Sequence, residues 1–201
     1  MSRLLLLRHG ESTWNAEHRW QGWADPPLSP RGEGQAAAAA RWLAGGDDPF
    51  AVVASSDLVR ARRTAEIVAG ALGLELAAAD PGLRERDVGH WTGLTTDEIR
   101  RDWPTELADW RAGRRSAAPG GEPEAALVAR VVAGLGALAA SLPAGAAAVV
   151  VTHGGVVRAV ERHLGTAPSP VGHLCGRWVE AAAGRPRLGL AVVLPDHERS
   201  A

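Results

Sequence analysis

The sequence predicts a three-layer α/β/α fold with a mostly parallel central sheet. Short apolar runs alternate with segments of helical periodicity along the chain. Three of the runs end in polar residues directly before a helix: Leu4–Leu7, Phe50–Ala54 and Ala146–Thr152. Such runs suit strands buried on both faces of a parallel sheet, although the pattern of Leu4–Leu7 alone also allows a buried helix. In 201 residues, 46% of them hydrophobic, we expect one domain over residues 1–201, with two small domains as the upper limit.

Terminal signals define the first two helices. Ser29 is the expected N-cap of a helix with Pro30 at its first position, and Gly45 and Gly46 end it. The second helix runs from Leu58 to Gly73, because its small and aliphatic residues recur at helical spacing. A weaker strand is predicted directly after it, at Leu74–Ala78.

Residues 80–123 are predicted to form loops and short helices that cap one edge of the sheet. The predicted pieces are a loop at Asp80–Gly93, a short helix capped by Thr95 and Glu98 that ends before Pro104, another at Glu106–Ala112, and a linker at Arg114–Pro123.

The remaining elements complete the alternation. They are a long helix from Pro123 to about Leu142, a strand at Ala146–Thr152, a helix from about Val156 to Leu164, and strands at Val171–Glu180 and Leu188–Leu194. We expect the polar residues at the end of the chain to be disordered.

Composition narrows the classes of function. The formal net charge is -1, so no overall field favours nucleic acid or a membrane as a partner. All 22 basic residues are Arg, which means that any basic contact to phosphate must come from Arg or His. Cys175 is the only cysteine, so neither an internal disulfide nor a CxxC metal site is expected. With no signal peptide and no stretch of about 20 apolar residues, we expect a cytoplasmic protein.

Three polar clusters are expected to converge at one edge of the sheet. Arg8 and His9 follow the first strand, Arg60 lies one turn into the helix after the second, and His153 follows the strand at Ala146–Thr152. The carboxyl ends of parallel strands share one edge, where open α/β sheets bind their ligands. Two imidazoles and two guanidinium groups at this edge indicate an anion site.

This set of residues suits phosphoryl transfer. A neutral imidazole is available as a nucleophile near neutral pH, and fixed cations can neutralise the phosphoryl oxygens without a metal. A carboxyl group must protonate the departing alcohol, and Glu85 is the best candidate. The residues alone do not choose Glu85 over Glu11, Asp87 or Glu122.

Other chemistries find less support. Ser12 lacks the GxSxG context of a hydrolase nucleophile, and no HExxH or close ligand spacing indicates a metal site. We therefore expect neither a metal nor another cofactor.

Six motifs follow one another along the chain: RHGES with WN (Arg8–Asn15), GW-D-PL and its continuation (Gly22–Ala36), SDL--RA--TA (Ser56–Ala65), L-RE---G-W-G (Leu83–Gly93), GGE (Gly120–Glu122) and V-THGG (Val150–Gly155). In this order they resemble the histidine phosphatase superfamily, which comprises cofactor-dependent phosphoglycerate mutases and related phosphatases. Together they span nearly the whole chain, which makes the resemblance more specific than any single motif.

The resemblance implies a role for each matching residue. His9 would be the phosphorylated nucleophile, Arg8, Arg60 and His153 would bind the phosphoryl group, and Glu85 would donate the proton. The assisting and substrate-binding residues implied by the resemblance are Asn15, Gln21, Gly22, Glu122 and Gly154. Two departures stand out. Pro123 stands where the family usually has Ser, and the segment with His173 and Cys175 differs from the family's Asn-containing pattern. The roles of His173 and Cys175 therefore stay open.

The expected function is metal-independent hydrolysis of a small phosphate ester through a phosphohistidine. The short chain resembles the phosphatase branch, with mutase-type transfer and a non-catalytic phosphate-ester binding module as alternatives. The substrate is not readable, although the arginines near the expected mouth of the site hint at a second acidic group on it: Arg19, Arg86, Arg114 and Arg115. Oligomeric state is open, and a homodimer is one arrangement that the sequence allows.

Overall fold

The computed structural model describes residues 2–181 and 187–193. Its strands are β1 (Ser2–Arg8), β2 (Phe50–Ser55), β3 (Ala147–Thr152), β4 (Cys175–Ala181) and β5 (Arg187–Val193). Its α-helices are α1 (Thr13–Ala16), α2 (Pro30–Ala44), α3 (Val59–Leu72), α4 (Thr96–Asp102), α5 (Pro104–Arg111), α6 (Glu124–Ser141) and α7 (Gly154–His163). Two single 3₁₀ turns, η1 (Pro81–Leu83) and η2 (Gly89–Trp91), lie between α3 and α4.

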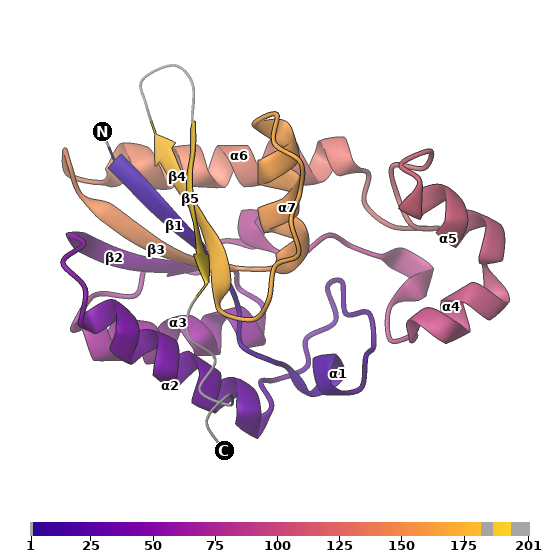
Figure 1. The fold of residues 1–201 in the computed structure, drawn as a ribbon, viewed down its shortest axis with the longest axis horizontal. Helices are drawn as coiled ribbons and strands as arrows, with labels where there is room; N and C mark the ends of the chain where they lie inside the picture. The colour runs from indigo at the N-terminus through magenta and orange to yellow at the C-terminus, as the bar shows by residue number, and fades with distance from the viewer. Residues whose placement is uncertain (1, 182–186, 194–201) are drawn as a thin grey trace.

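The five strands form one mixed sheet in the order β2-β3-β1-β4-β5. β1 and β2 both run parallel to β3, which confirms the predicted parallel core. β4 pairs antiparallel with β1, and β5 pairs antiparallel with β4. A parallel core therefore carries an antiparallel hairpin at one edge (Figure 1).

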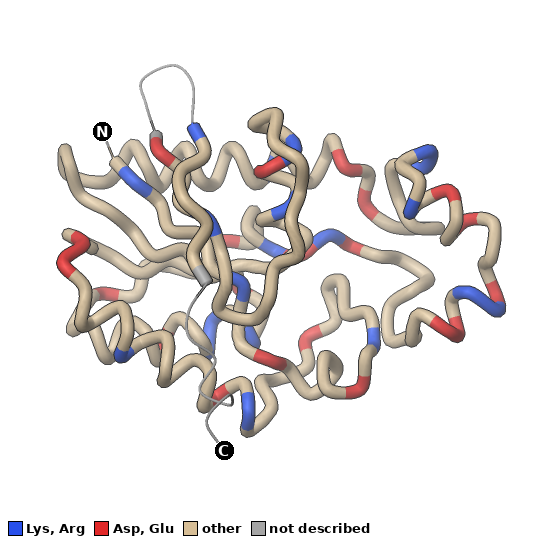
Figure 2. Tube along the Cα trace, viewed as in Figure 1, with Lys and Arg blue, Asp and Glu red and all other residues tan. Residues whose placement is uncertain are grey.

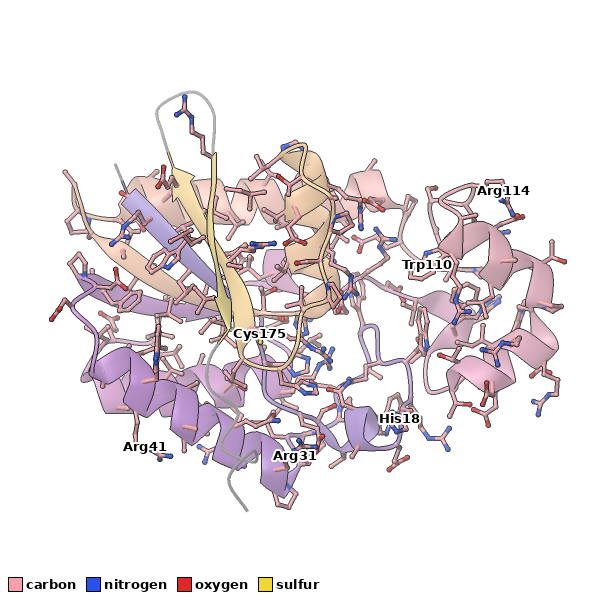
Figure 3. All side chains as sticks on the ribbon, viewed as in Figure 1. His18, Arg31, Arg41, Trp110, Arg114 and Cys175 are labelled. Carbon is pink, nitrogen blue, oxygen red and sulfur yellow. The ribbon has the colours of Figure 1, made fainter. Side chains whose placement is uncertain are left out.

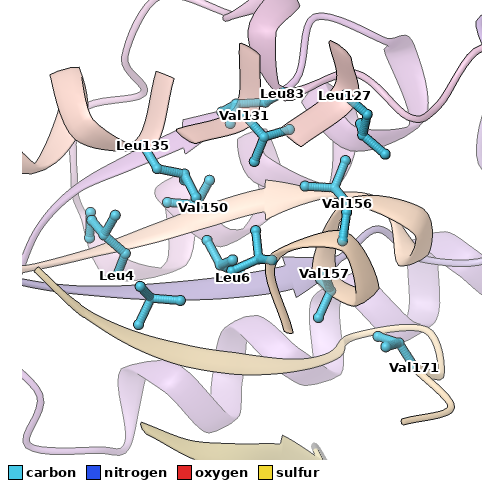
Figure 4. Close-up of a cluster of buried hydrophobic side chains, with 14 residues drawn as sticks. Leu4, Leu6, Leu83, Leu127, Val131, Leu135, Val150, Val156, Val157 and Val171 are labelled. Atoms are coloured by element: carbon cyan, nitrogen blue, oxygen red, sulfur yellow. The ribbon is translucent and has the colours of Figure 1, made fainter. Parts of the chain in front are cut away.

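Helices cover both faces of the sheet because β1 is apolar on both sides. Leu4 and Leu6 pack on one face with residues of α6 and α7, as Figure 4 shows. Leu5 and Leu7 pack on the other face with residues of α2 and α3. Successive side chains of a strand point to opposite faces, so four leucines in a row supply both cores. The predicted three-layer α/β/α arrangement is confirmed (Figure 1).

The segment predicted to cap the sheet has a small core of its own. α4 and α5 lie at the far end of the molecule from the β4–β5 hairpin (Figure 1). Trp91, Ile99 and Leu107 are buried there, and Trp20 packs against them from the loop after α1. The capping box at Thr95 is present, since Glu98 N–H donates to the Thr95 hydroxyl and Thr95 N–H donates to the Glu98 carboxylate.

Two predicted strands differ from the structure. Residues 74–78 are not a strand and pair with β2 only through the bridge between Val53 and Leu76, so the sheet ends at β2. The strand predicted from Val171 begins only at Cys175, because Leu174 has a φ of 54° and the chain turns there. Leu194 and the polar end of the chain lie outside the described residues.

By length and composition alone, α6 could cross a membrane, with a mean hydropathy of 1.5 over 18 residues. Leu127, Val131 and Leu135 nevertheless lie buried in the core against the sheet. A core helix passes the same test, and a single such helix is weak support for a membrane span.

We expect Gly176→Ala to weaken the joint between the parallel core and the hairpin. A Cβ at Gly176 would lie 1.7 Å from the backbone oxygen of Leu6, so β4 would have to move away from β1. Urea denaturation should show a loss of about 3 kcal/mol in the free energy of unfolding. Gly70→Ala in α3 is the control, because its Cβ would meet no atom within 4 Å and should stabilise the helix by about 0.5–1 kcal/mol. Equal stabilities of the two variants would contradict this prediction.

Candidate active site

His9 follows β1 and presents one ring nitrogen with a free electron pair. Its Nδ1 lies 2.6 Å from the Gly10 carbonyl oxygen, and Arg60 Nε lies 3.3 Å from its Nε2. A guanidinium group can only donate, so Nε2 must be the acceptor and the proton must sit on Nδ1. The ring is therefore neutral, with its Nε2 electron pair directed toward Arg60.

Arg60, in the first turn of α3, is fully buried and held by neutral groups. Its Nη1 donates to the Ala24 carbonyl at 2.7 Å, and its Nη2 donates to the Gly22 carbonyl at 2.9 Å. Burial lowers the pKa of Arg60 to about 10, so the group stays protonated at neutral pH. Carbonyl oxygens orient the guanidinium without cancelling its charge, which leaves that charge available to an anion beside His9.

His153 meets His9 edge-on at the end of β3. The two ring centroids are 5.1 Å apart, at an interplanar angle of 65°. His153 is fully buried, and within the part of the chain that the structure describes neither of its ring nitrogens has a hydrogen-bond partner. Buried polar groups without partners are rare and costly, so His153 carries an unmet hydrogen-bonding demand directly beside His9.

Burial and neighbouring cations keep both imidazoles uncharged. The pKa of His9 lies well below its usual value because of burial, followed by the charges of Arg60 and Arg8. The pKa of His153 is lowered by burial, the charge of Arg60 and the proximity of His9. Neutral imidazoles between fixed cations suit a nucleophile that attacks a phosphoryl group.

Arg8 lies on the hairpin side of His9. Its Nη1 donates to the Val171 carbonyl at 2.8 Å, which ties the loop before β4 to the end of β1. Burial lowers the pKa of Arg8, and the charge of Glu85 opposes this effect. In Figure 2, basic and acidic segments lie close together where the sheet meets the cap.

Glu85 is held by two backbone donors. Its Oε1 accepts from Arg86 N–H at 2.8 Å, and its Oε2 accepts from Gly155 N–H at 3.0 Å. Gly155 leaves room for this contact, since a Cβ there would lie 2.0 Å from Glu85 Oε1. One of the four carboxylates left open by the residues alone is thus anchored at the start of α7.

A cavity of about 2030 Å³ opens beside these groups. Most predicted site residues line it: Arg8, His9, Asn15, Gln21, Gly22, Arg60, Glu85 and Gly154. His153 does not line the cavity and is buried against His9. Small-molecule sites usually measure about 300–1,000 Å³, so this cavity has room for much more than a phosphoryl group.

Glu122 lies away from the cavity lining. Its carboxylate binds Arg130 through two hydrogen bonds of 2.7 and 2.8 Å, and the cavity-lining residues do not include it. The contact to substrate implied for Glu122 therefore stays a prediction, and its observed partner is a residue that the sequence analysis did not single out.

Two residues with open roles lie at the site. His173 lines the cavity, with its ring centroid 6.2 Å from that of His9 and its Nε2 3.2 Å from Asn15 Oδ1. Burial lowers the pKa of His173 to about 3, with the charge of Arg8 as the next cause. Cys175 lines the sheet side and Trp110 the cap side (Figure 3).

The four arginines noted near the expected mouth are divided by the structure. Arg19, Arg86 and Arg115 line the cavity, whereas Arg114 is exposed and pairs with Asp109. Arg158 of α7 also lines the cavity and was not predicted. Among residues 2–181 and 187–193, no group of three or more His, Cys, Asp or Glu side chains is arranged to hold a metal ion.

A family model for the histidine phosphatase superfamily (branch 1) matches residues 4–174. The chain belongs to this superfamily. The match begins in β1 and ends directly before β4, so it includes His9, Arg60, Glu85 and His153.

Relatives within the superfamily carry two kinds of name. A 2,3-bisphosphoglycerate-dependent phosphoglycerate mutase of Methylobacterium radiotolerans is 39% identical over 167 residues, which cover 80% of this chain and 78% of the relative. A mycobacterial glucosyl-3-phosphoglycerate phosphatase, solved in complex with VO₃, is 32% identical, with a TM-score of 0.81 and coverage of 94% of this chain and 97% of its own. The Bacillus stearothermophilus protein YhfR is 29% identical, with a TM-score of 0.84 and coverage of 94% and 96%.

The mutase-named relative weakens one argument from the sequence. Its aligned region covers nearly equal shares of the two chains, so the relative is about as long as this protein. The short chain therefore does not by itself distinguish phosphatases from mutases.

We expect Gly155→Ala to displace Glu85 and slow turnover of phosphate esters. A methyl group at that position would overlap Glu85 Oε1, and misplacement of a catalytic group by about 1 Å can cost about 10²-fold in rate. Initial rates with a phosphate-ester panel check this result. Gly34→Ala is the control, because it also lines the cavity and its Cβ would meet no atom within 4 Å. Equal losses in the two variants would contradict the assigned contact.

We also expect His9, His153 and His173 to stay neutral as the pH falls to about 5.5. Burial lowers the pKa of each ring, so the folded protein binds fewer protons below about pH 6.5 than the unfolded chain does. The free energy of unfolding should therefore decrease as the pH falls through this range. ¹⁵N NMR of labelled imidazoles, assigned with single His variants, checks the protonation states. A ring at one of these positions that titrates near pH 6.5 would contradict the expectation.

Proposed function

We propose that this protein hydrolyses small phosphate monoesters through a phosphohistidine on His9, without a metal or another cofactor. One observation carries the proposal: the ring centroids of two neutral imidazoles lie 5.1 Å apart beside the buried Arg60 and the half-buried Arg8, and among the described residues the nitrogens of His153 lack hydrogen-bond partners. A phosphoryl group is an anion with several acceptor oxygens, so it complements Arg8, Arg60 and the N–H of His153.

In the first step, His9 Nε2 attacks phosphorus and the bond from phosphorus to the ester oxygen breaks. The electrons of that bond go to the leaving oxygen, which takes a proton from Glu85 as the alcohol departs. Arg60 donates its Nε–H to His9 Nε2 in the structure, and during phosphorylation this donor turns to a phosphoryl oxygen.

In the second step, water attacks the phosphohistidine. Glu85, now a carboxylate, takes a proton from the water, the bond between His9 Nε2 and phosphorus breaks, and inorganic phosphate leaves. His9 regains its electron pair and Glu85 its proton, so the cycle closes without a further reactant.

The substrate is proposed to be a phosphorylated metabolite with a second polar or acidic part. The large cavity and the additional arginines that line it, such as Arg115 and Arg158, support this proposal. The name of the mycobacterial relative, a glucosyl-3-phosphoglycerate phosphatase, is consistent with a sugar acid phosphate as the class to test first.

Mutase-type transfer is the second candidate, and the mutase names of the sequence relatives favour it. A mutase returns the phosphoryl group from His9 to a sugar acid instead of passing it to water. Incubation with 3-phosphoglycerate distinguishes the two, because a phosphatase releases inorganic phosphate whereas a mutase yields the isomer without net release.

We expect His9→Ala to lower phosphatase activity by at least about 10³-fold, because the attacking nitrogen is lost. Wild-type protein incubated with a ³²P-labelled ester and quenched in alkali should carry label in the alkali-stable, acid-labile form typical of phosphohistidine, and the variant should not. Activity should also be unchanged by EDTA. His163→Ala, at the exposed end of α7, is the control and should keep full activity. An active His9→Ala protein, or loss of activity in EDTA, would contradict the proposed mechanism.

A further inference from the structure

Arg130 uses every donor of its guanidinium group within a few residues of Glu85. Nη1 donates to the carbonyls of Gly82 and Arg84 at 2.8 and 2.7 Å. Nη2 donates to the Glu85 carbonyl at 2.9 Å and to Glu122 Oε2 at 2.8 Å, while Nε donates to Glu122 Oε1 at 2.7 Å. A guanidinium has five N–H groups, and all five are engaged.

The backbone that Arg130 binds has little regular structure of its own. Glu85 follows the single turn η1 and precedes η2, so helix or sheet hydrogen bonds do not fix its peptide. Arg130 collects three carbonyls from residues 82–85, and Trp23 Nε1 adds a fourth bond, to the Glu85 carbonyl at 2.8 Å. Arg130 of α6 thus fixes the backbone from which the Glu85 side chain extends.

Glu122 orients Arg130 for this task. Two parallel hydrogen bonds between a carboxylate and a guanidinium fix the plane of the guanidinium. With that plane fixed, the three remaining N–H groups point at the carbonyls of residues 82–85. The exposed fractions of the two side chains are only 20% for Arg130 and 11% for Glu122, so the pair is partly withdrawn from water and its geometry is well defined.

We infer that the Arg130–Glu122 pair is the positioning device for the proton donor Glu85. This inference rests on the proposed function and assigns Glu122 a role through Arg130 instead of a contact to substrate. The pair holds the peptide of Glu85, and Gly155 N–H holds its carboxylate, so the acid is constrained at both ends.

Chemistry separates this role from general support of the fold. An alkyl phosphate releases a strongly basic alkoxide, which needs a proton as it departs, whereas p-nitrophenolate is stable as an anion at neutral pH. Loss of a well-placed acid should therefore slow phosphohistidine formation from an alkyl ester and have little effect with p-nitrophenyl phosphate. A general loss of structure should slow both esters alike.

The experiment measures the pre-steady-state release of the alcohol, because this phase precedes the step in which Glu85 acts as a base. The substrates are glycerol 3-phosphate and p-nitrophenyl phosphate, and the main variant is Arg130→Lys. Lys keeps the positive charge near His153 but loses the planar five-donor group. We expect about a 10²-fold slower phase with glycerol 3-phosphate and less than about a threefold change with p-nitrophenyl phosphate.

Two further variants complete the test. Glu122→Gln keeps Arg130 intact and should slow alcohol release from the alkyl ester selectively, by a smaller factor than Arg130→Lys. This variant keeps the inference testable if the Arg130→Lys protein folds poorly. Glu85→Gln should show the largest selective loss. The matched control is Arg177→Lys, which weakens another ion pair, between Arg177 Nε and Glu161 Oε1 at 2.6 Å, and has the same 20% exposed arginine side chain.

The outcomes distinguish the inference from the proposed function. A selective loss in Arg130→Lys and Glu122→Gln, but not in Arg177→Lys, supports the inference. Equal losses with both esters in Arg130→Lys and Glu122→Gln overturn it while His9 catalysis stands. An active His9→Ala protein overturns the proposed function itself.

Discussion

The site depends on a guanidinium group, that of Arg60, buried beside neutral imidazoles. Arg60 is completely buried, yet within the described ranges of the chain its guanidinium donates hydrogen bonds only to two backbone carbonyls and to the acceptor nitrogen of His9. Burial of a charge without an ion-pair partner is energetically costly. The carbonyl dipoles of Gly22 and Ala24, in the loop between α1 and α2, offset this cost by solvating the guanidinium. Burial, followed by the charge of Arg60, lowers the pKa of His9, so the arrangement that favours an anion also keeps the imidazole neutral.

The rest of the fold holds this arrangement in place. Three parallel strands bring His9, Arg60 and His153 to one edge, and four consecutive leucines let β1 pack on helices at both faces. Loops that belong to different parts of the chain then tie themselves to the strand ends: Val171 to Arg8, and Gly22 and Ala24 to Arg60. Positions that look like separate motifs in sequence are thus mechanically connected.

The convergence of His9, Arg60 and His153 could be predicted because the ends of buried strands can be located in a sequence. A buried run that stops in Arg8-His9 or in His153 has a defined place in a parallel sheet, and helical spacing then locates Arg60. The strand predicted at residues 74–78 was wrong, because an apolar segment at the edge of a sheet has the same composition whether it makes one bridge or a full ladder. The residues alone left Glu85 beside three other carboxyl groups, and its contact with Gly155 spans 70 residues, so no local pattern could reveal it.

Arg130 was missed for a related physical reason. The acceptors of Arg130 are mainly backbone carbonyls, which every residue has. The side chains of residues 82–85 therefore give no pattern from which the contact could be predicted. A usable signal existed in its surroundings, since it is the one basic residue in the apolar stretch of α6. A solitary basic residue inside such a helix requires a partner, and the sequence offers Glu124, six residues earlier, and Glu122, eight residues earlier. The structure pairs Arg130 with Glu122.

The unpartnered nitrogens of His153 have a thermodynamic consequence. These nitrogens leave a buried hydrogen-bonding demand that no described residue meets, beside clustered like charges, so the fold is less stable than it could be. Under the proposed function, an oxyanion bound between the imidazoles and the guanidinium groups supplies the missing hydrogen bonds and offsets the like charges. Such an anion binds only the folded state. Thermal melting temperature should then rise with occupancy, so heat resistance can rank candidate metabolites even before any reaction is followed.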